Sequence, residues 1–386
     1  MNTDSRNPGG GRPPIKRYTA QRREPTVRDI LSKWVVKRPT YSLSPSLSRV
    51  TLALVILLAC LLVTASVLLI AARDVYFDTH SRPSGNEGGS GVVNNDGERP
   101  FADGASGNML LQWADNTKII PADSIHASYA ALADLSTGEI FASRKADEKI
   151  YPASMTKVMT LIVVVENLPS EDSLQELIEI SPEVYEEMKR EGSSGIGLEP
   201  GEKLSVESLL YALMLRSDGI AACELAKYVA GSVDNFVELM NQKAEKMGLS
   251  NTHFENPTGL HHPDHHSTSR EIATIMAYAM NMKLCRRILV TQSYTAPCQG
   301  ADGKTFNYNL YHNLIVTQFE NISPNQPTAV TVAAGKTGFT DESRYCLVTY
   351  AESADGQGYV CVTAKGGSYA ECIEDYLTIY NTYVKP

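Results

Sequence analysis

The 386-residue sequence lacks several patterns that assign a chain to a common class. It has no internal repeat, so an architecture of stacked repeats is excluded. It has no Gly-x-Ser-x-Gly segment, which argues against a serine hydrolase of the nucleophile-elbow type. The composition, with 27 glycines, 19 prolines and 20% charged residues, does not suggest a fibrous or wholly disordered chain. What remains is a globular protein with room for one large domain or two ordinary ones, plus extensions.

Basic residues are scarce outside the first part of the chain. Residues 1–49 carry eleven Lys and Arg against three acidic residues, whereas residues 73–386 carry 24 basic and 41 acidic residues, a net charge of about −17. So acidic a remainder is a poor candidate for binding nucleic acid. The basic segment fits a juxtamembrane region attracted to anionic lipid better than a DNA-binding arm.

One long apolar run, residues 50–72, contains no charged side chain. At about 1.5 Å per residue, a helix of this length spans the roughly 30 Å hydrocarbon core of a bilayer. A cleaved signal peptide is the alternative, but its apolar stretch is usually only about 7 to 15 residues long. Because the long segment 1–49 also precedes the run, we expect an uncleaved transmembrane anchor. The charge bias predicts a single-pass membrane protein, with residues 1–49 in the cytoplasm and the rest outside.

Residues 73–108 are rich in Gly, Ser and Asn and show no apolar period, so we expect a flexible linker. Residues 109–386 would then form the outer domain, which contains six of the seven cysteines. Cys346 and Cys361 are expected on neighbouring strands, where an exported domain could form a disulfide. Buried free thiols are the slightly favoured alternative.

Strands are predicted at both ends of this domain, with helices between them. The expected strands are 127–135, 139–144, 344–351 and 358–366, the last two joined by a turn at Asp355-Gly356. The expected helices are 154–168, 205–216, 220–230, 232–248, 267–282 and 367–383. This order predicts an α+β fold in which N- and C-terminal strands form one sheet covered by helices.

Ser154 and Lys157 stand at the start of the apolar helix expected at 154–168. A spacing of three puts both side chains on one helix face. A serine becomes a nucleophile when a neighbouring base takes its proton, and a lysine can do this if burial lowers its pKa. By itself the pair is a weak signal, because any Ser-x-x-Lys occurs roughly twice by chance in such a chain. The alternative is that Ser154 is a helix cap and Lys157 a surface lysine. The apolar residues that follow Lys157 favour instead a nucleophile paired with a buried base.

A second element is Lys336-Thr337-Gly338, which follows a β-branched stretch and is expected on or entering a strand. Gly338 would let a substrate backbone approach closely, while Lys336 and Thr337 offer a charge and a hydroxyl to a carboxylate. A phosphate-binding loop is the alternative, but the glycine spacing that it needs is absent. Ser217, at a break between two predicted helices, looks in isolation like an ordinary turn residue.

The order of the three elements, first Ser154 with Lys157, then Ser217, then Lys336-Thr337-Gly338, is the signature of penicillin-recognising enzymes. The surrounding sequence resembles the serine D-Ala-D-Ala carboxypeptidase family, the low-molecular-mass penicillin-binding proteins, over residues 125–384. The similar segments are LADLSTGEIFASRKADEKIYPASMTKVMT, LEPGEKLSVESLLYALMLRS, NTHFENPTGLHHPDHHSTSREIA and GKTGFTDESRYCLV. The resemblance implies the fold of β-lactamases and transpeptidases, an antiparallel sheet flanked by two groups of helices.

The resemblance also implies roles for individual residues. Ser154 would be the nucleophile that forms an acyl-enzyme, Lys157 the general base, and Ser217 a proton relay to the leaving D-alanine. The substrate's carboxylate would be held by Lys336 and Thr337 on the strand that contains Gly338, and backbone amides of Ser154 and Phe339 would form the oxyanion hole. No metal or cofactor is expected. The expected partners are peptidoglycan stem peptides, and β-lactam antibiotics as acylating inhibitors.

Two departures from the family pattern stand out. The middle triplet of the family is Ser-x-Asn, whereas the same register here reads Ser217-Asp218-Gly219. Losing one polar contact costs about 1–3 kcal/mol, roughly tenfold to hundredfold in rate. In addition, the second, β-rich domain and the C-terminal membrane helix of the family have no expected counterpart in the short stretch 339–386. We expect the N-terminal span to replace that anchor.

Three functions therefore stay open. The favoured one is a serine DD-carboxypeptidase that removes the terminal D-Ala from D-Ala-D-Ala ends. A penicillin-binding sensor or scaffold with impaired catalysis is the alternative that Gly219 motivates. A β-lactamase is less favoured, because no Glu-x-x-Leu-Asn segment lies between Ser217 and Lys336. The cluster His261, His262, Asp264, His265 and His266 invites a zinc interpretation, but the family has the same loop without a metal, and we expect none.

Overall fold

The computed structural model describes residues 110–312 and 329–385. The segments predicted as cytoplasmic (1–49), membrane-spanning (50–72) and linking (73–108) lie outside the described residues. Within the described part of the chain, no helix combines the length and the apolarity needed to cross a membrane.

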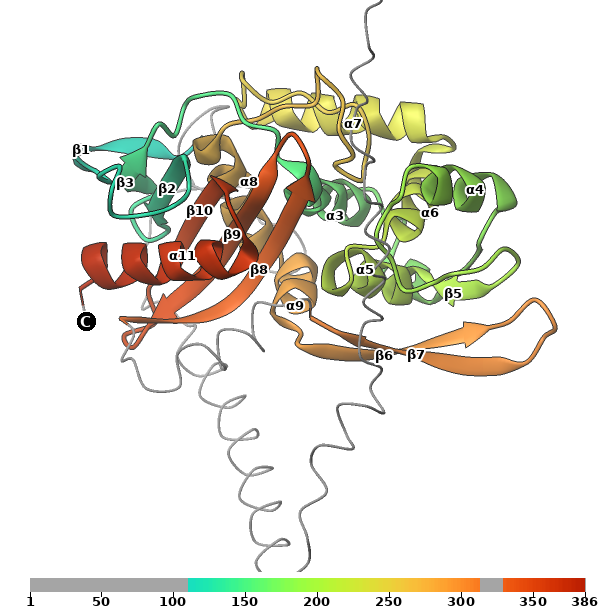
Figure 1. Ribbon diagram of the computed structural model, residues 1–386. Helices are drawn as coiled ribbons and strands as arrows, with labels where there is room; N and C mark the ends of the chain where they lie inside the picture. The colour runs from blue at the N-terminus through green and yellow to red at the C-terminus, as the bar shows by residue number, and fades with distance from the viewer. Residues whose placement is uncertain (1–109, 313–328, 386) are drawn as a thin grey trace, which may run out of the picture. The chain divides into compact units, whose positions relative to one another are not determined.

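A six-stranded sheet, in the order β1-β3-β2-β10-β9-β8, lies on the left of the domain as drawn in Figure 1. Its strands are β1 (Gln112–Ile119), β2 (Tyr129–Asp134), β3 (Glu139–Arg144), β8 (Val330–Thr340), β9 (Arg344–Ser353) and β10 (Gly358–Gly366). The pairing of β2 with β10 joins the N- and C-terminal strands and confirms the predicted sheet. β1 was not predicted, because it is largely exposed and shows no alternating apolar pattern. It runs parallel to β3, so the expected antiparallel arrangement is wrong for this one pair.

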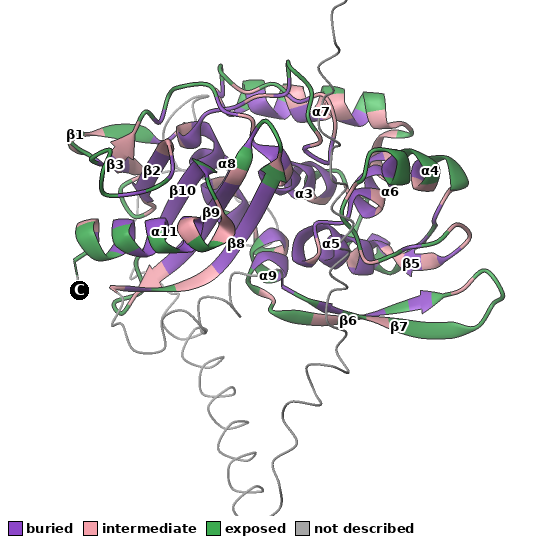
Figure 2. Ribbon diagram, in the orientation of Figure 1, coloured by how far each residue is buried: buried purple, intermediate pink, exposed green. Residues whose placement is uncertain are grey.

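Helices cover both faces of the sheet, which explains why the central strands are almost continuously buried (Figure 2). On one face lies α11 (Tyr369–Tyr383), which begins where the Ser368 side chain accepts a hydrogen bond from the Glu371 N–H. The other face packs on α8 (Ser269–Asn281) and the helices around it. Those further helices are α3 (Lys157–Glu166), α4 (Pro182–Arg190), α5 (Val206–Leu215), α6 (Gly219–Ala230), α7 (Val233–Lys246) and α9 (Lys283–Val290).

The mixed fold with helices on both sides of a sheet agrees with the predicted class. The helix expected at 154–168 begins as a 3-10 turn, Ala153–Thr156, and continues as α3, in which eight of the ten residues are buried. Ser232 caps α7 by accepting a hydrogen bond from the Asn235 N–H.

A second, four-stranded sheet was not predicted. It consists of β4 (Leu177–Glu179), β5 (Lys203–Ser205), β6 (Ser293–Gln299) and β7 (Thr305–Tyr311), in that order. Two of its strands have only three residues, too few to show a period. The hairpin of β6 and β7 extends away from the helices in Figure 1, and most of its residues are exposed.

The six cysteines of the described residues are all buried free thiols, which confirms the slightly favoured expectation. Cys346 and Cys361 do lie on paired strands, β9 and β10, but Cys361 stands opposite Thr349. Cys346 packs in the core on the α3 side of the sheet and Cys361 in the core on the α11 side. Since successive strand residues point to opposite faces, the two sulfur atoms are separated by the sheet.

Candidate active site

Ser154 lies in the 3-10 turn that begins α3, where its side chain is half-buried. The residue before it, Ala153, has a φ of 47°, an uncommon conformation for a non-glycine residue. Two glycines let other segments approach this turn. A Cβ added at Gly259 would lie 1.9 Å from the Ala153 carbonyl oxygen, and one at Gly338 would lie 3.2 Å from the Ser154 backbone nitrogen. The turn is therefore enclosed by a loop and by strand β8.

Lys157 is buried, with 2% of its surface exposed, and points at Ser154. Its Nζ donates a hydrogen bond to Ser154 Oγ at 3.1 Å and another to the Thr258 carbonyl oxygen at 2.6 Å. Burial lowers the pKa of this amine to about 8, although the charge of Asp218 acts in the opposite direction. A lysine with a pKa near 8 is neutral in an appreciable fraction of molecules at neutral pH, as a general base requires.

The loop at residues 256–260 contacts Lys157 and Thr160. In the sequence it is only part of a segment that resembles the family, and no role at the site was predicted for it. The Pro257 carbonyl accepts a hydrogen bond from Thr160 Oγ1, and the next carbonyl, of Thr258, accepts from Lys157. Asn256 Oδ1 holds the turn by accepting from the N–H groups of Thr258 and Gly259. The Asn-Pro-Thr-Gly segment signals a turn, but only the folded chain brings that turn to the lysine.

Ser217 and Lys336 meet although they are 119 residues apart. Ser217 lies between α5 and α6 with a φ of 58°, and its Oγ accepts a hydrogen bond from Lys336 Nζ at 2.9 Å. The same Nζ donates to the Thr337 carbonyl at 2.9 Å. Lys336 is buried, and burial together with the nearby charge of Lys157 places its pKa well below the usual value. Two buried lysines therefore lie close enough to influence each other's ionisation.

The strand β8 that contains Lys336 is the outermost strand of the six-stranded sheet within the described residues. An edge strand leaves one row of backbone N–H and C=O groups free to pair with an extended peptide. Gly338 adjoins the Ser154 turn, since a Cβ there would lie 2.9 Å from the Pro152 carbonyl oxygen. Thr337 is buried, whereas Phe339 is 41% exposed. This arrangement sets the backbone of Gly338 beside Ser154, with Phe339 as the next residue of the strand.

Asp218 is fully buried next to Ser217. In the sequence it is only the middle residue of the triplet Ser217-Asp218-Gly219, and no role was predicted for it. Its carboxylate accepts hydrogen bonds from the N–H groups of Ala221, at 2.9 Å, and Ile196, at 2.7 Å. Burial raises the pKa of this carboxyl, while the two N–H groups and the charge of Lys157 lower it. Asp218 thus caps α6 and joins it to the segment around Ile196.

The predicted histidine cluster contains one buried and several exposed members. His265 is 2% exposed, and both ring nitrogens have partners, Thr156 Oγ1 at 2.8 Å and the Glu255 N–H at 3.2 Å. Burial lowers its pKa to about 3, so the ring is neutral and ties this loop to the Ser154 turn. Because both nitrogens are used, His265 is not available as a metal ligand.

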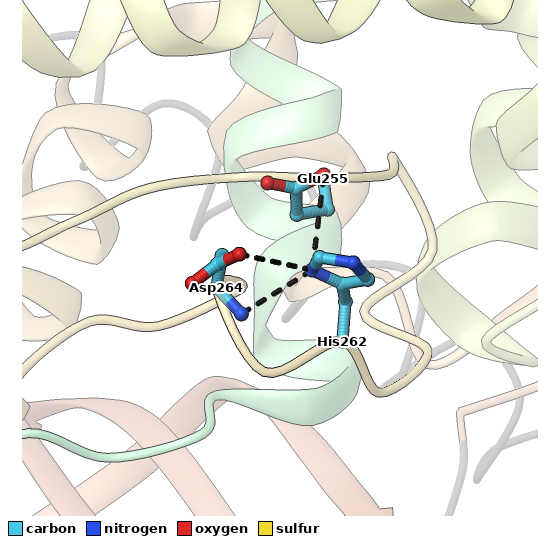
Figure 3. A group of neighbouring side chains, drawn as sticks. All are labelled: Glu255, His262 and Asp264. Carbon is cyan, nitrogen blue, oxygen red and sulfur yellow. Dashed lines mark hydrogen bonds and ion pairs between the residues drawn. The ribbon is translucent and has the colours of Figure 1, made fainter.

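Two exposed members of this cluster, His262 and Asp264, form a group with Glu255, which was not part of the prediction; the ligand atoms of the three lie within 4.8 Å of one another (Figure 3). His262 Nδ1 is 3.8 Å from a Glu255 oxygen and 4.0 Å from an Asp264 oxygen. The same Nδ1 accepts a hydrogen bond from the Asp264 N–H at 3.2 Å. The lone pair that would bind a metal is thus engaged within the loop, and the expectation of no metal stays a prediction.

The structure brings together the seven residues to which the resemblance gives roles, from the 3-10 turn before α3, from α3 itself, from the α5–α6 junction and from β8. A serine hydroxyl lies beside a buried amine of lowered pKa, and a second serine bonds to a second buried lysine. An open strand edge runs next to the first serine. Such a site suits attack by Ser154 on a carbonyl of an extended peptide chain.

Comparison with known proteins agrees with this geometry. A family model described as "D-alanyl-D-alanine carboxypeptidase" matches residues 116–363. The chain is 30% identical over 232 residues to D-alanyl-D-alanine carboxypeptidase DacF of Bacillus subtilis, covering 59% of this chain and 55% of that one. It is 36% identical over 159 residues to D-alanyl-D-alanine carboxypeptidase DacC of Escherichia coli, covering 40% of each. The matched region is about half the length of these curated relatives.

Solved structures show the same fold. The Streptomyces K15 DD-transpeptidase is 27% identical, with a TM-score of 0.61 over 69% of this chain and 98% of that one. A structure titled D-alanyl-D-alanine carboxypeptidase from Mycobacterium tuberculosis has a TM-score of 0.58 over 71% of this chain and 97% of that one. At 23% identity, the latter likeness supports the fold alone.

Proposed function

This chain belongs to the D-alanyl-D-alanine carboxypeptidase family, and on that premise we propose that it is a serine DD-carboxypeptidase acting on peptidoglycan stem peptides. It removes the terminal D-Ala from D-Ala-D-Ala ends through an acyl-enzyme. The observation that carries the proposal is the 3.1 Å contact between Ser154 Oγ and the buried Nζ of Lys157. Two hydrogens and a lone pair remain on a neutral amine. With one hydrogen donated to Thr258, the lone pair can turn to the serine hydroxyl.

The reaction proceeds in two steps. Ser154 Oγ attacks the carbonyl carbon of the penultimate D-Ala while Lys157 Nζ takes the hydroxyl proton. The negative charge that develops on the carbonyl oxygen is stabilised by the backbone N–H groups of Ser154 and Phe339. The C–N bond then breaks, and the proton that Lys157 took passes by way of Ser217 to the leaving amino group, which leaves Lys157 neutral and the Ser217 hydroxyl intact. Water attacks the resulting ester, which releases the shortened peptide and restores the Ser154 hydroxyl.

Lys336, Thr337 and Gly338 form the binding part of this scheme. The ammonium group of Lys336 attracts the C-terminal carboxylate, and the Thr337 hydroxyl offers it a hydrogen bond. Gly338 keeps the strand close to Ser154, because a side chain there would meet the Pro152 backbone. β-Lactam antibiotics would enter the same site and acylate Ser154.

We further propose the topology that the sequence predicts. Residues 50–72 anchor the protein in a bacterial cell membrane, residues 1–49 lie in the cytoplasm, and the domain at 109–386 lies outside after the linker at 73–108. The long uncharged run and the basic segment before it support this arrangement. The full chain should stay in the membrane fraction after a carbonate wash, whereas a variant that lacks residues 50–72 should be found in the soluble fraction. If the variant that lacks residues 50–72 also stays in the washed membrane fraction, the anchor is not at this position.

The activity is tested by D-alanine release from a diacyl-L-Lys-D-Ala-D-Ala peptide by the full chain, with Ser154→Ala as the control. We expect release that disappears in the variant. A chain that releases nothing, yet is labelled at Ser154 by a fluorescent penicillin, would refute the carboxypeptidase proposal for this substrate. That second outcome would support a penicillin-binding sensor.

A further inference from the structure

The segment from residue 192 to residue 197 packs on the first residue of α6, next to the site. We propose that Ser193 is a substrate-positioning residue whose hydroxyl takes the place of the side chain that Gly219 lacks. This inference rests on the proposed function, because it concerns the binding of the same peptide. It assigns the role to a residue of a different segment, which lies between α4 and β5 in the chain.

The first argument is the space at Gly219. A Cβ added there would lie 1.9 Å from Ser193 Oγ, 2.9 Å from Ser193 Cβ and 3.2 Å from Met188 Sδ. The φ of Gly219 is not in the left-handed region, so the backbone does not require glycine. The first position of a helix also tolerates most residues. The neighbouring side chains of Ser193 and Met188, rather than the backbone, exclude a side chain at residue 219, and the nearest atom is the Ser193 hydroxyl oxygen.

The second argument is that the segment is held in this position. The Gly219 N–H donates to the Ser194 carbonyl at 3.0 Å, and the Ser193 N–H donates to the Met188 carbonyl at 2.9 Å. The buried carboxylate of Asp218 accepts from the Ile196 N–H at 2.7 Å. These three bonds fix the backbone on both sides of Ser193. The backbone that places Ser193 next to the side-chain position of residue 219 is therefore held in place by the fold.

The third argument is that the hydroxyl is available. Among the residues that the structure describes, Ser193 Oγ makes a single hydrogen bond, a long one of 3.4 Å to the Ser194 carbonyl. The side chain is half-buried, so part of it can be reached from solvent. Gly219 follows two residues after Ser217, which bonds to Lys336. A hydroxyl that can both donate and accept thus lies at the side-chain position of residue 219. There, on the proposed function, a peptide N–H or C=O of the substrate can use it.

The functional test compares Ser193→Ala with Ser194→Ala in the full chain. The change is chemically the same, but the Ser194 side chain is exposed and its contribution to the segment is its backbone carbonyl. We expect Ser193→Ala to lower kcat/KM for D-alanine release about three- to tenfold, the usual effect of one neutral hydrogen bond. Ser194→Ala should match the wild type, and the Tm of both should be unchanged. Equal kcat/KM in all three proteins would overturn the inference.

The placement is tested separately by stability and by moving the hydroxyl. Gly219→Ala should lower the Tm, and the double variant Ser193→Gly/Gly219→Ala should recover it, because the added Cβ then finds space. Ser193→Gly/Gly219→Ser should recover the kcat/KM lost in Ser193→Gly alone. A Gly219→Ala variant as stable as the wild type would refute the placement.

A wild type that neither releases D-alanine nor is labelled by penicillin would refute the proposed function. The positioning role of Ser193 would then be refuted as well, while the Tm values of the Gly219 variants would still test whether Ser193 lies at the side-chain position of residue 219. A wild type that is active, with Ser193→Ala unchanged, would refute the inference alone.

Discussion

The ionisation of Lys157 leads to a prediction about the pH dependence of acylation. The lysine must be neutral to accept the proton of Ser154, so the reaction rate should rise with pH through the pKa of about 8. A solvated lysine with its ordinary pKa of 10.5 would be neutral in only about 0.03% of molecules at pH 7. A pKa of about 8 makes that fraction roughly 10%. Burial therefore supplies about 300-fold more of the reactive form at neutral pH.

The assay is the initial rate of labelling by a fluorescent penicillin between pH 6 and about 10, with Ser154→Ala as the blank. We expect a rise of about tenfold per pH unit below the midpoint and a plateau above it. The midpoint belongs to the pair of Lys157 and Lys336, because the charge of one affects the other. A midpoint at or above 10, or a rate independent of pH across this range, would refute the reasoning that burial activates Lys157.

The same reasoning predicts the effect of Asp218. Its carboxylate raises the pKa of Lys157, opposing the larger effect of burial. Asp218→Asn removes that charge, so the midpoint of the labelling profile should move to lower pH. An amide can accept at only one atom, so the variant also weakens one of the bonds to Ile196 and Ala221. A midpoint that moves upward would contradict the assigned sign.

Three further predictions concern stability. Lys157→Met should abolish D-alanine release, because the general base is lost. It should also raise the unfolding free energy by up to roughly 3 kcal/mol at pH 7, since the pKa of Lys157 is about 8 in the folded chain and 10.5 in the unfolded chain. That gain should shrink between pH 8 and 10.5, because Lys157 of the wild type loses its proton at lower pH in the folded chain than in the unfolded chain. Denaturant titrations at several pH values measure the gain, and a gain that does not change with pH would contradict this prediction. Gly259→Ala should lower the unfolding free energy by about 1–3 kcal/mol and slow penicillin labelling, because Gly259 has a φ of 80° and an added Cβ would meet the Ala153 carbonyl. An unchanged Tm together with an unchanged labelling rate would refute this. Dithiothreitol should leave the Tm unchanged, since the described cysteines are free and a lost disulfide would cost about 2–4 kcal/mol; a marked fall would show a disulfide.

Much of the fold was predictable because its strongest elements have long, regular patterns. The apolar helix α3 and the β9–β10 hairpin follow from local periodicity and turn residues. The strand β1 and the four-stranded sheet were missed because their residues are mostly exposed or their strands very short. Their pairing depends on partners far along the chain, as in β5 with β6. Local patterns carry no information about such partners.

The sequence by itself determined which groups do the proposed chemistry. The spacing of Ser154 and Lys157 and the order of the three motifs along the chain can both be read from the sequence without the fold. Only the tertiary structure decided their surroundings. The Thr258 carbonyl reaches Lys157 from 101 residues away, and Ser193 fills the space at Gly219. The burial that lowers the pKa of Lys157 is likewise a property of the packed core. A pKa and a steric fit depend on every atom nearby, and the folded chain brings those atoms from distant parts of the sequence.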